Sequence, residues 1–151
     1  MQFRYESVGR FLKGNTHLHT TCSDGDWSID QTLDRYQQAG YDFLCVTDHN
    51  IVTRLEDRST DSFCLIDSTE INDVPADWRT HHVVCIGVGA DFPERSDFAT
   101  MLAAARDSGA ITYLAHPGWS GNLLDQWPPL GVDGVEIFNG MVHMDNHRES
   151  G

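Results

Sequence analysis

Histidine and carboxylate residues recur along this sequence, each at or near the end of a short apolar segment that is typical of a β-strand. Imidazole nitrogens and carboxylate oxygens are ligands that Zn²⁺, Mn²⁺ and Fe²⁺ accept in proteins. The residues that could bind such ions are His17, His19, Asp24, His49, Glu70, His82 and His116. If the fold brings them together, they predict a centre that binds divalent cations.

Each of these residues, considered alone, has a simpler structural explanation. A His-x-His pair such as His17 and His19 is a weak pattern, and Asp24 followed by Gly25 at positive φ is typical of a tight turn. A single buried histidine is more often hydrogen-bonded within a core than bound to metal. The set as a whole favours a metal, because packing at strand ends prefers apolar residues.

The residues between these positions predict alternating strands and helices. One helix begins after Ser28 and ends at Gly40, and a second, capped by Ser96, covers 97–107 and ends at Gly109. The predicted strands cover residues 15–20, 42–47, 63–67, 83–88, 110–115 and 134–138. Strands that alternate with crossover connections favour a parallel sheet, so we expect residues 1–151 to form a single α/β domain.

A parallel sheet would gather the candidate ligands at one edge, because ligands bind outside the carboxyl ends of parallel strands. On the first strand, the side-chain period of two turns His17 and His19 to the same face. His82 fits less well since it precedes its strand, and His81 would be the inward residue if the register were shifted by one. Asp48 is expected to cap or orient a neighbouring side chain rather than to bind metal.

The overall charge and the cysteine pattern restrict the partners of this chain. Ten Lys and Arg residues against 23 Asp and Glu residues give a formal net charge of −13, which disfavours binding to nucleic acid or to an acidic membrane surface. The four cysteines form no Cys-x-x-Cys pair, and no apolar run is long enough to span a bilayer. These features predict a cytoplasmic protein and allow a small phosphorylated substrate held by bound cations.

The order of these motifs resembles the polymerase and histidinol phosphatase family, usually called the PHP domain. The resemblance is carried by KGNTHLHTTCSDG at 13–25, GYDFLCVTDHN at 40–50, Glu70, His82 and the Ala-His-Pro run at 115–117. A signature of several separated parts is far more specific than any one of them. The Lys-Gly-Asn start and the Thr-Asp-His-Asn end of the first two motifs are most similar to a carbaryl hydrolase-like branch.

The resemblance implies a distorted (β/α)7 barrel that binds two or three divalent ions. The ligands implied are His17, His19 and Glu70 for a first ion, Glu70, His82 and His116 for a second, and Asp24 and His49 for a third. Asp48 would lie beside the ligands without touching an ion. The residues implied to act in catalysis through the bound ions are His17, His19, Glu70 and His116.

One part of the family pattern has no counterpart here. An Asp-x-His motif should complete the first and third ion sites after a seventh strand, but Asp145 and His147 lie only nine and eleven residues beyond Glu136. We therefore expect the barrel to lack its last strand or strands, and a missing C-terminal segment or another chain to complete it. An incomplete ligand set binds metal less tightly, which leaves the activity of this fragment open.

The reaction that follows from the resemblance is hydrolysis of a phosphate mono- or diester. In this hypothesis, Zn²⁺, Mn²⁺ or Fe²⁺ lowers the pKa of bound water from about 15.7 toward about 7, and the metal-bound hydroxide attacks phosphorus. Two alternatives remain open: a metal-stabilised module without catalysis, and a metallohydrolase that acts on a carbamate or amide bond. The sequence contains no Walker loop and no GxSxG elbow that would indicate another enzyme class.

A few other residues have weaker claims to function. Arg54 could bind a phosphate, but an exposed ion pair with a neighbouring carboxylate such as Glu56 or Asp57 is the simpler interpretation. Trp119, Trp127 and Phe138 could line a substrate pocket, although large aromatic residues in loops more often pack against a core. Cys22 is the one thiol close to the His-x-His pair.

Overall fold

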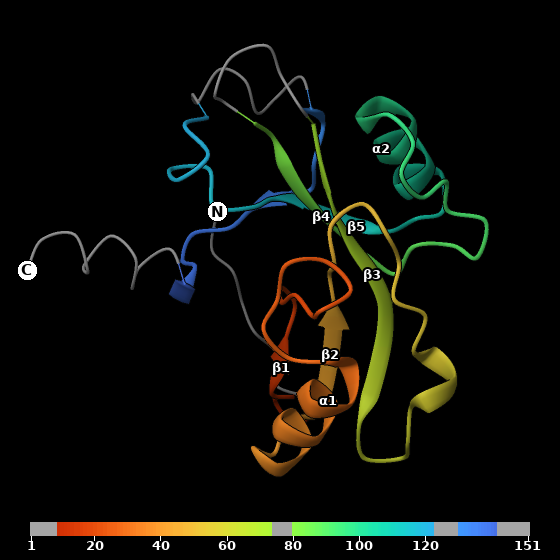
Figure 1. The fold of residues 1–151 in the computed structure, drawn as a ribbon, viewed down its shortest axis with the longest axis vertical. Helices are drawn as coiled ribbons and strands as arrows, with labels where there is room; N and C mark the ends of the chain where they lie inside the picture. Colours follow the sequence, from red (N-terminus) through yellow and green to blue (C-terminus); the bar gives the residue numbers. More distant parts are fainter. Residues whose placement is uncertain (1–8, 74–79, 123–129, 142–151) are drawn as a thin grey trace, which may run out of the picture.

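The computed structural model describes residues 9–73, 80–122 and 130–141 (Figure 1). Its elements, in chain order, are β1 (Gly14–Asn15), α1 (Ile29–Gln38), β2 (Phe43–Val46), the 3-10 helix η1 (Glu56–Arg58), β3 (Cys64–Asn72), β4 (His82–Ile86), α2 (Phe98–Asp107), β5 (Ile111–Leu114) and β6 (Gly134–Val135). Within these described ranges the strands form a six-stranded sheet in the order β1-β2-β3-β4-β5-β6. The chain therefore has the mixed α/β character that the sequence predicts.

The fourth strand, β4, runs antiparallel to both of its neighbours, which corrects the prediction of an all-parallel sheet. The pairs β1–β2, β2–β3 and β5–β6 are parallel, whereas β3–β4 and β4–β5 are antiparallel. A parallel connection needs about a dozen or more residues for its crossover. Only residues 73–81 separate β3 from β4, so the chain returns in the opposite direction.

The long strand β3 changes its partner part-way along. Its first half, from Cys64 to Asp67, pairs with β2, and its second half, from Ser68 to Asn72, pairs with β4. In Figure 1, β3 connects the lower part of the molecule, with α1, β1 and β2, to the upper part, with α2 and β4. The result is a curled, half-barrel sheet that is consistent with part of a TIM-like fold. The complete (β/α)7 barrel stays a prediction.

Helix α1 begins and ends at the residues that the sequence predicts. Ser28 accepts a hydrogen bond from Gln31 N, and Gln31 Oε1 accepts one from Ser28 N, which together form a capping box. Gly40 follows the helix with a φ of +72°, a conformation that favours glycine. Leu33 anchors the helix in a buried apolar cluster with Leu18, Leu44, Val46, Leu55, Phe63 and Leu65.

Helix α2 is capped by Asp97 rather than by the predicted Ser96. The Asp97 carboxylate accepts hydrogen bonds from Thr100 N and Oγ1, and a carboxylate also interacts favourably with the positive end of the helix dipole. Gly109 follows the helix with a φ of +77°, as predicted. The helix covers a second apolar cluster, which contains Ile71, Val83, Cys85, Met101, Leu102, Ala105 and Leu114.

Two strand boundaries differ from the prediction in ways that matter for the candidate ligands. The first strand, predicted over 15–20, is the short β1, so His17 and His19 follow it instead of lying within it. The third strand, predicted over 63–67, continues further and includes Glu70. It is longer because the antiparallel β4 supplies a second partner for its last residues.

Some predictions concern residues outside the described ranges. These are the spacing of Asp145 and His147 and the suggested role of Trp127. No helix within the described ranges is both long and apolar enough to cross a membrane. All four cysteines are described, and all are free thiols.

Candidate metal centre

Glu70 is the buried centre of the candidate site. It lies on β3, where successive side chains point to opposite faces of the sheet. The next residue, Ile71, therefore packs in the apolar cluster under α2, while Glu70 points to the other face. None of the Glu70 side chain is exposed. A carboxylate buried to this extent requires compensating partners.

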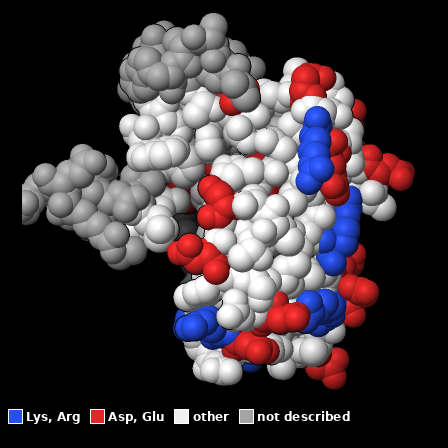
Figure 2. Space-filling view, viewed as in Figure 1, with Lys and Arg blue, Asp and Glu red and all other residues white. Residues whose placement is uncertain are grey.

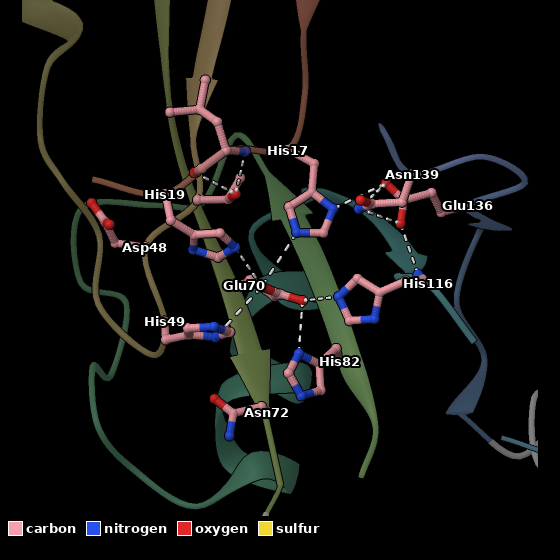
Figure 3. A network of polar contacts seen from close by, with 12 residues as sticks. His17, His19, Asp48, His49, Glu70, Asn72, His82, His116, Glu136 and Asn139 are labelled. Carbon is pink, nitrogen blue, oxygen red and sulfur yellow. Dashed lines mark hydrogen bonds and ion pairs between the residues drawn. The ribbon is translucent and has the colours of Figure 1, made fainter. Parts of the chain in front are cut away.

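Five imidazoles surround the Glu70 carboxylate (Figure 3). From Oε2, the distances are 3.0 Å to His19 Nε2, 3.3 Å to His17 Nε2 and 3.5 Å to His49 Nδ1. From Oε1, they are 2.9 Å to His82 Nδ1 and 3.2 Å to His116 Nε2. The structure thus brings every histidine that the sequence singled out as a ligand to one carboxylate.

The antiparallel direction of β4 explains how His82 reaches this cluster. As the first residue of a parallel strand it would lie at the far edge of the sheet, but here it pairs with Asn72 at the carboxyl end of β3. The side chain of His81 contacts Asp73 instead, with 2.9 Å between His81 Nδ1 and Asp73 Oδ2. Of the two histidines that the sequence left open, His82 is therefore the one at Glu70.

His17 and His19 reach Glu70 from the segment that follows β1. Leu18, between them, is buried in the apolar cluster under α1. Leu18 N donates to Thr47 Oγ1, and Leu18 O accepts hydrogen bonds from Thr47 N and Oγ1, so a threonine side chain replaces part of the strand ladder. The predicted alternation holds although the regular strand has ended, because Leu18 points to the core and both imidazoles point to Glu70.

Asp24 lies at the outer edge of the imidazole cluster. Its side chain is 66% exposed, with Oδ1 3.6 Å from His19 Nδ1 and Oδ2 3.5 Å from His49 Nε2. The turn that carries Asp24 passes close to the backbone at His19, since a Cβ added at Gly25 would lie 2.3 Å from His19 O. Gly25 is thus required for close approach, and not for the positive φ that the sequence suggested.

Asp48 is buried beside the imidazole cluster and accepts hydrogen bonds from the loop before α1 and from the loop after β2. Oδ1 accepts hydrogen bonds from Thr20 N at 2.7 Å and Ser23 Oγ at 2.8 Å. Oδ2 accepts from Thr20 Oγ1 at 2.8 Å and Thr53 Oγ1 at 2.7 Å. Burial favours a higher pKa for Asp48, but these hydrogen bonds lower the pKa below its usual range. Asp48 therefore positions the segment that carries His49, as expected for a residue that orients its neighbours.

His49 is held in place through its sequence neighbours Asp48, described above, and Asn50. Asn50, which has a φ of +57°, donates from its backbone N to Glu70 O at 2.9 Å. Its side-chain Oδ1 accepts a hydrogen bond from Asn72 N at 3.0 Å. Burial lowers the pKa of His49, and the neighbouring His19 adds to this effect against the opposing influence of Glu70. The neutral imidazole that results is the form that binds metal.

Glu136 is a carboxylate at the site that the sequence did not single out. Its Oε1 lies 3.0 Å from His17 Nδ1, and its Oε2 accepts a hydrogen bond of 2.7 Å from His116 N (Figure 3). His116 has a φ of +27°, which is strained for a residue with a side chain. The carboxylate thus orients one imidazole and holds the backbone of another. The sequence signal that could have indicated Glu136 is its position as an acidic residue within the otherwise apolar predicted strand at 134–138.

The carboxylates determine the protonation of the cluster. Burial lowers the pKa of His17, but the carboxylates of Glu136 and Glu70 outweigh burial and raise it to about 9. Burial raises the pKa of Glu70, but hydrogen bonds from the surrounding imidazoles, with His116 the strongest, hold it far below its usual range. In the metal-free protein at neutral pH, Glu70 is therefore ionised and His17 is protonated.

A cleft of about 680 Å³ opens onto the imidazoles, a size typical of small-molecule sites. Trp119 and Phe138 line it and are exposed, although the sequence favoured packing against a core for such aromatic residues. Arg54 does not line the cleft. Its guanidinium donates hydrogen bonds to Asp67 Oδ2 at 3.1 Å and to two backbone carbonyl oxygens. The simpler interpretation of Arg54 as an ion-paired side chain is therefore correct, but its partner is Asp67 on β3 and not Glu56 or Asp57.

Two solved structures have a fold similar to that of this chain. A two-domain protein from Bacteroides vulgatus ATCC 8482, containing a predicted PHP-like metal-dependent phosphoesterase, matches with a TM-score of 0.60 and 20% identity, over 83% of this chain and 44% of that chain. A candidate metal-dependent phosphoesterase from Bifidobacterium adolescentis ATCC 15703 matches with a TM-score of 0.60 and 16% identity, over 83% of this chain and 77% of that chain. The chain has a PHP-like fold.

Sequence comparison covers less of the chain. No protein-family model matches it. The DNA polymerase/3′-5′ exonuclease PolX of Bacillus subtilis (strain 168) is 26% identical over 73 residues, which are 48% of this chain and 13% of that protein. The PHP-like fold therefore rests mainly on the similarity of structure. None of these similarities distinguishes the carbaryl hydrolase-like branch, which stays a prediction.

The donor atoms of this PHP-like fold suit divalent ions. Ligand atoms that lie within 4.8 Å of one another form the sets His17–His19–Glu70, His19–Asp24–His49 and His49–Glu70–His82. Among the described residues, the buried atoms Glu70 Oε2, His19 Nδ1 and His49 Nδ1 have ion-pair contacts at 3.0 to 3.6 Å but no hydrogen bond of good geometry. Buried polar atoms in a native structure are usually satisfied. A cation coordinated by these atoms would satisfy them.

Proposed function

We propose that this chain is a divalent-metal-dependent phosphoesterase that hydrolyses a phosphate mono- or diester. The observation that carries the proposal is the convergence of five imidazoles on the buried Glu70 carboxylate, with three imidazole nitrogens within 3.5 Å of Oε2 and two within 3.2 Å of Oε1. Nitrogen and oxygen donors without a thiolate suit Zn²⁺, Mn²⁺ or Fe²⁺. The PHP-like fold supports the same class of reaction, because the solved counterparts are described as metal-dependent phosphoesterases, one predicted and one a candidate.

The ligands in this proposal are those expected from the sequence. They are His17, His19 and Glu70 for a first ion, Glu70, His82 and His116 for a second, and Asp24 and His49 for a third. Divalent ions in such a site acidify water and stabilise negative charge on the oxygens of a phosphoryl group. The number of ions, two or three, and their identity are parts of the proposal.

Second partners on the imidazoles orient the ligand nitrogens. Glu136 binds the Nδ1 side of His17, which leaves His17 Nε2 facing Glu70. Ser120 Oγ lies 3.0 Å from His116 Nδ1, which leaves His116 Nε2 facing Glu70 in the same way. Such partners fix the tautomer and the ring orientation of metal-binding histidines. The chain would thus present its donors without rearrangement of these rings.

The same proposal includes a small phosphorylated substrate, a single domain over residues 1–151 and a cytoplasmic location. The free state of all four cysteines supports a reducing compartment. The net charge of −13 supports binding of the phosphoryl group through cations rather than through basic side chains.

Metal content and phosphatase activity of the purified chain test the proposal together. We expect more than one equivalent of metal by elemental analysis, and cleavage of p-nitrophenyl phosphate or its diester in the presence of Mn²⁺ or Zn²⁺. His17→Ala should abolish cleavage, because it removes a donor that lies 3.3 Å from the Glu70 carboxylate.

His81→Ala is the matched control. His81 is adjacent to His82 in sequence but contacts Asp73 instead of Glu70, so this variant should keep both its metal and its activity. Metal bound without turnover of either ester would favour the non-catalytic module, and turnover of only a carbamate or an amide would favour the alternative hydrolase. A folded chain that binds no divalent metal would contradict the proposal.

A further inference from the structure

The cleft in front of the imidazoles has an unusual charge distribution for a phosphate-binding site. None of the described residues that line it is Lys or Arg, whereas Asp24, Asp26, Glu70 and Glu136 all line it. Proteins commonly hold phosphate groups with Arg or Lys side chains. In this cleft the positive charge that receives a phosphoryl group must come from bound ions at its inner end.

Two described basic side chains, Arg35 and Arg54, are engaged in other contacts. The Arg35 guanidinium stacks over the Trp27 ring, 4.3 Å from its centroid, and Arg54 is paired with Asp67. On the face shown in Figure 2, Lys and Arg lie along the right-hand edge and across the lower end, and the middle of the face has none. A second phosphate group on a substrate would therefore meet acidic or uncharged side chains among the described residues that line the cleft.

Trp119 supplies an apolar surface directly beside the candidate ligands. Its ring centroid lies 5.2 Å from that of His116 and 6.1 Å from that of His82, and its plane is nearly perpendicular to both imidazoles. Its backbone N donates to His116 O at 3.0 Å, so the ligand and the indole belong to one turn. Although it is a large aromatic residue, 57% of its surface is exposed. A fixed and exposed indole is a suitable contact surface for an aromatic or apolar group.

We infer, building on the proposed function, that the substrate carries a single phosphoryl group on an aromatic or apolar alcohol, and that Trp119 selects it through the alcohol part. Water attacks phosphorus, one P–O bond forms and the ester P–O bond breaks, and the products of a monoester are the free alcohol and inorganic phosphate. The acidic lining disfavours further phosphate groups by like-charge repulsion. Trp119 is thus a specificity-determining residue.

Matched pairs of substrates test this inference in the metal-loaded chain. Benzyl phosphate and ethyl phosphate release alcohols of similar acidity, so the ratio of their kcat/KM values reports contact with the apolar group. We expect a preference for benzyl phosphate of about 10-fold. Propane-1,3-diol bisphosphate should be hydrolysed about 10-fold less efficiently than propyl phosphate, because it adds only a second phosphate group.

Variants of Trp119 separate selection from a general loss of activity. Trp119→Ala should bring the benzyl-to-ethyl ratio close to one, whereas Trp119→Phe should retain most of the preference because it keeps an aromatic surface. Ile111→Ala is the control, since Ile111 is an apolar residue with 61% of its surface exposed that does not line the cleft. This variant should retain the wild-type ratio.

Binding of phosphonates makes the inference testable without turnover. Calorimetry with the metal-loaded chain should show about 10-fold tighter binding of benzylphosphonate than of ethylphosphonate, and Trp119→Ala should remove the difference. Equal affinities, or a preference for the bisphosphate or a single-stranded oligonucleotide, would overturn the inference. If no ester is hydrolysed, the proposed function fails, while the phosphonate affinities still decide the inference.

Discussion

The His17 imidazole lies between two carboxylates, with Glu70 on its Nε2 side and Glu136 on its Nδ1 side. Burial works against the charged ring, yet the two carboxylates raise the pKa of His17 to about 9. A histidine must be neutral to bind a metal. At neutral pH, metal binding to His17 therefore has to displace a proton.

We expect metal binding at about pH 7.5 to release about one proton from His17. Calorimetry in two buffers with different ionisation enthalpies measures this release. The release should disappear as the pH rises through about 9, because His17 is then neutral before the metal binds. Glu136→Gln removes one of the charges that raise the pKa, so it should reduce the release and weaken metal affinity about 10- to 100-fold.

Asp133→Asn is a control for the loss of a carboxylate. Asp133 accepts hydrogen bonds from Thr112 N and Oγ1 and does not contact the imidazole cluster. Its variant should match the wild type in proton release and metal affinity. If Glu136→Gln also matched the wild type in both measurements, the role assigned to Glu136 would be wrong.

At the scale of secondary structure, α1 and α2 hold the sheet in place from positions outside the imidazole cluster. Helix α1 depends on its Ser28 capping box and on Leu33, which is buried against the residues of β2 and β3. Neither residue contacts Glu70 or its histidines. Changes at the start of α1 should therefore alter stability and leave the metal-binding groups intact.

Ser28→Ala is expected to lower the free energy of unfolding by about 1 kcal/mol, because Gln31 N loses its side-chain acceptor. Urea denaturation measures this change. Ser62→Ala is the matched control, since the structure assigns Ser62 a hydrogen bond through its backbone N and not its hydroxyl. Equal stability of the two variants would show that the capping box contributes little, and a loss of metal affinity in Ser28→Ala would show that α1 acts on the site.

At the scale of the whole molecule, the candidate metal centre joins segments that pack in different places. The apolar cluster under α1 includes Leu18, next to His17 and His19, and the cluster under α2 includes Val83, next to His82. Glu70 contacts histidines from both sides. A cation bound at Glu70 would therefore link the two apolar clusters and stabilise the complete fold.

Addition of Zn²⁺ or Mn²⁺ at about 100 times its dissociation constant should raise the free energy of unfolding by about 2.7 kcal/mol. Urea denaturation with metal and with a chelator measures the difference. Glu70→Gln should eliminate most of it, whereas Glu94→Gln, a change at an exposed carboxylate, should not. The same stabilisation in Glu70→Gln would mean that the ions bind elsewhere. The difference should also shrink at acidic pH, since protons compete for the imidazoles.

Local signals predicted most of the helix boundaries. The capping residue Ser28 and the final glycines of both helices act over a few neighbouring residues, so the sequence contains the necessary information. The predicted cap of α2 was Ser96 and the observed cap is Asp97, because both are good capping residues at adjacent positions and local propensity does not distinguish them. The direction of β4 was not accessible in this way, because the predicted strands at 63–67 and 83–88 leave residues 68–82 between them, which is enough for a parallel crossover. Only the observed extension of β3 to Asn72 shortens the connection to residues 73–81.

By itself, the sequence determined which side chains could bind cations, because the chemistry of an imidazole or a carboxylate belongs to the residue type. Only the tertiary structure decided that His82 rather than His81 lies at Glu70, since the antiparallel pairing of β4 sets that direction. It also decided the role of Glu136, which is 119 positions from its partner His17. No periodicity or cap links residues so far apart, and only packing of the complete chain brings them together.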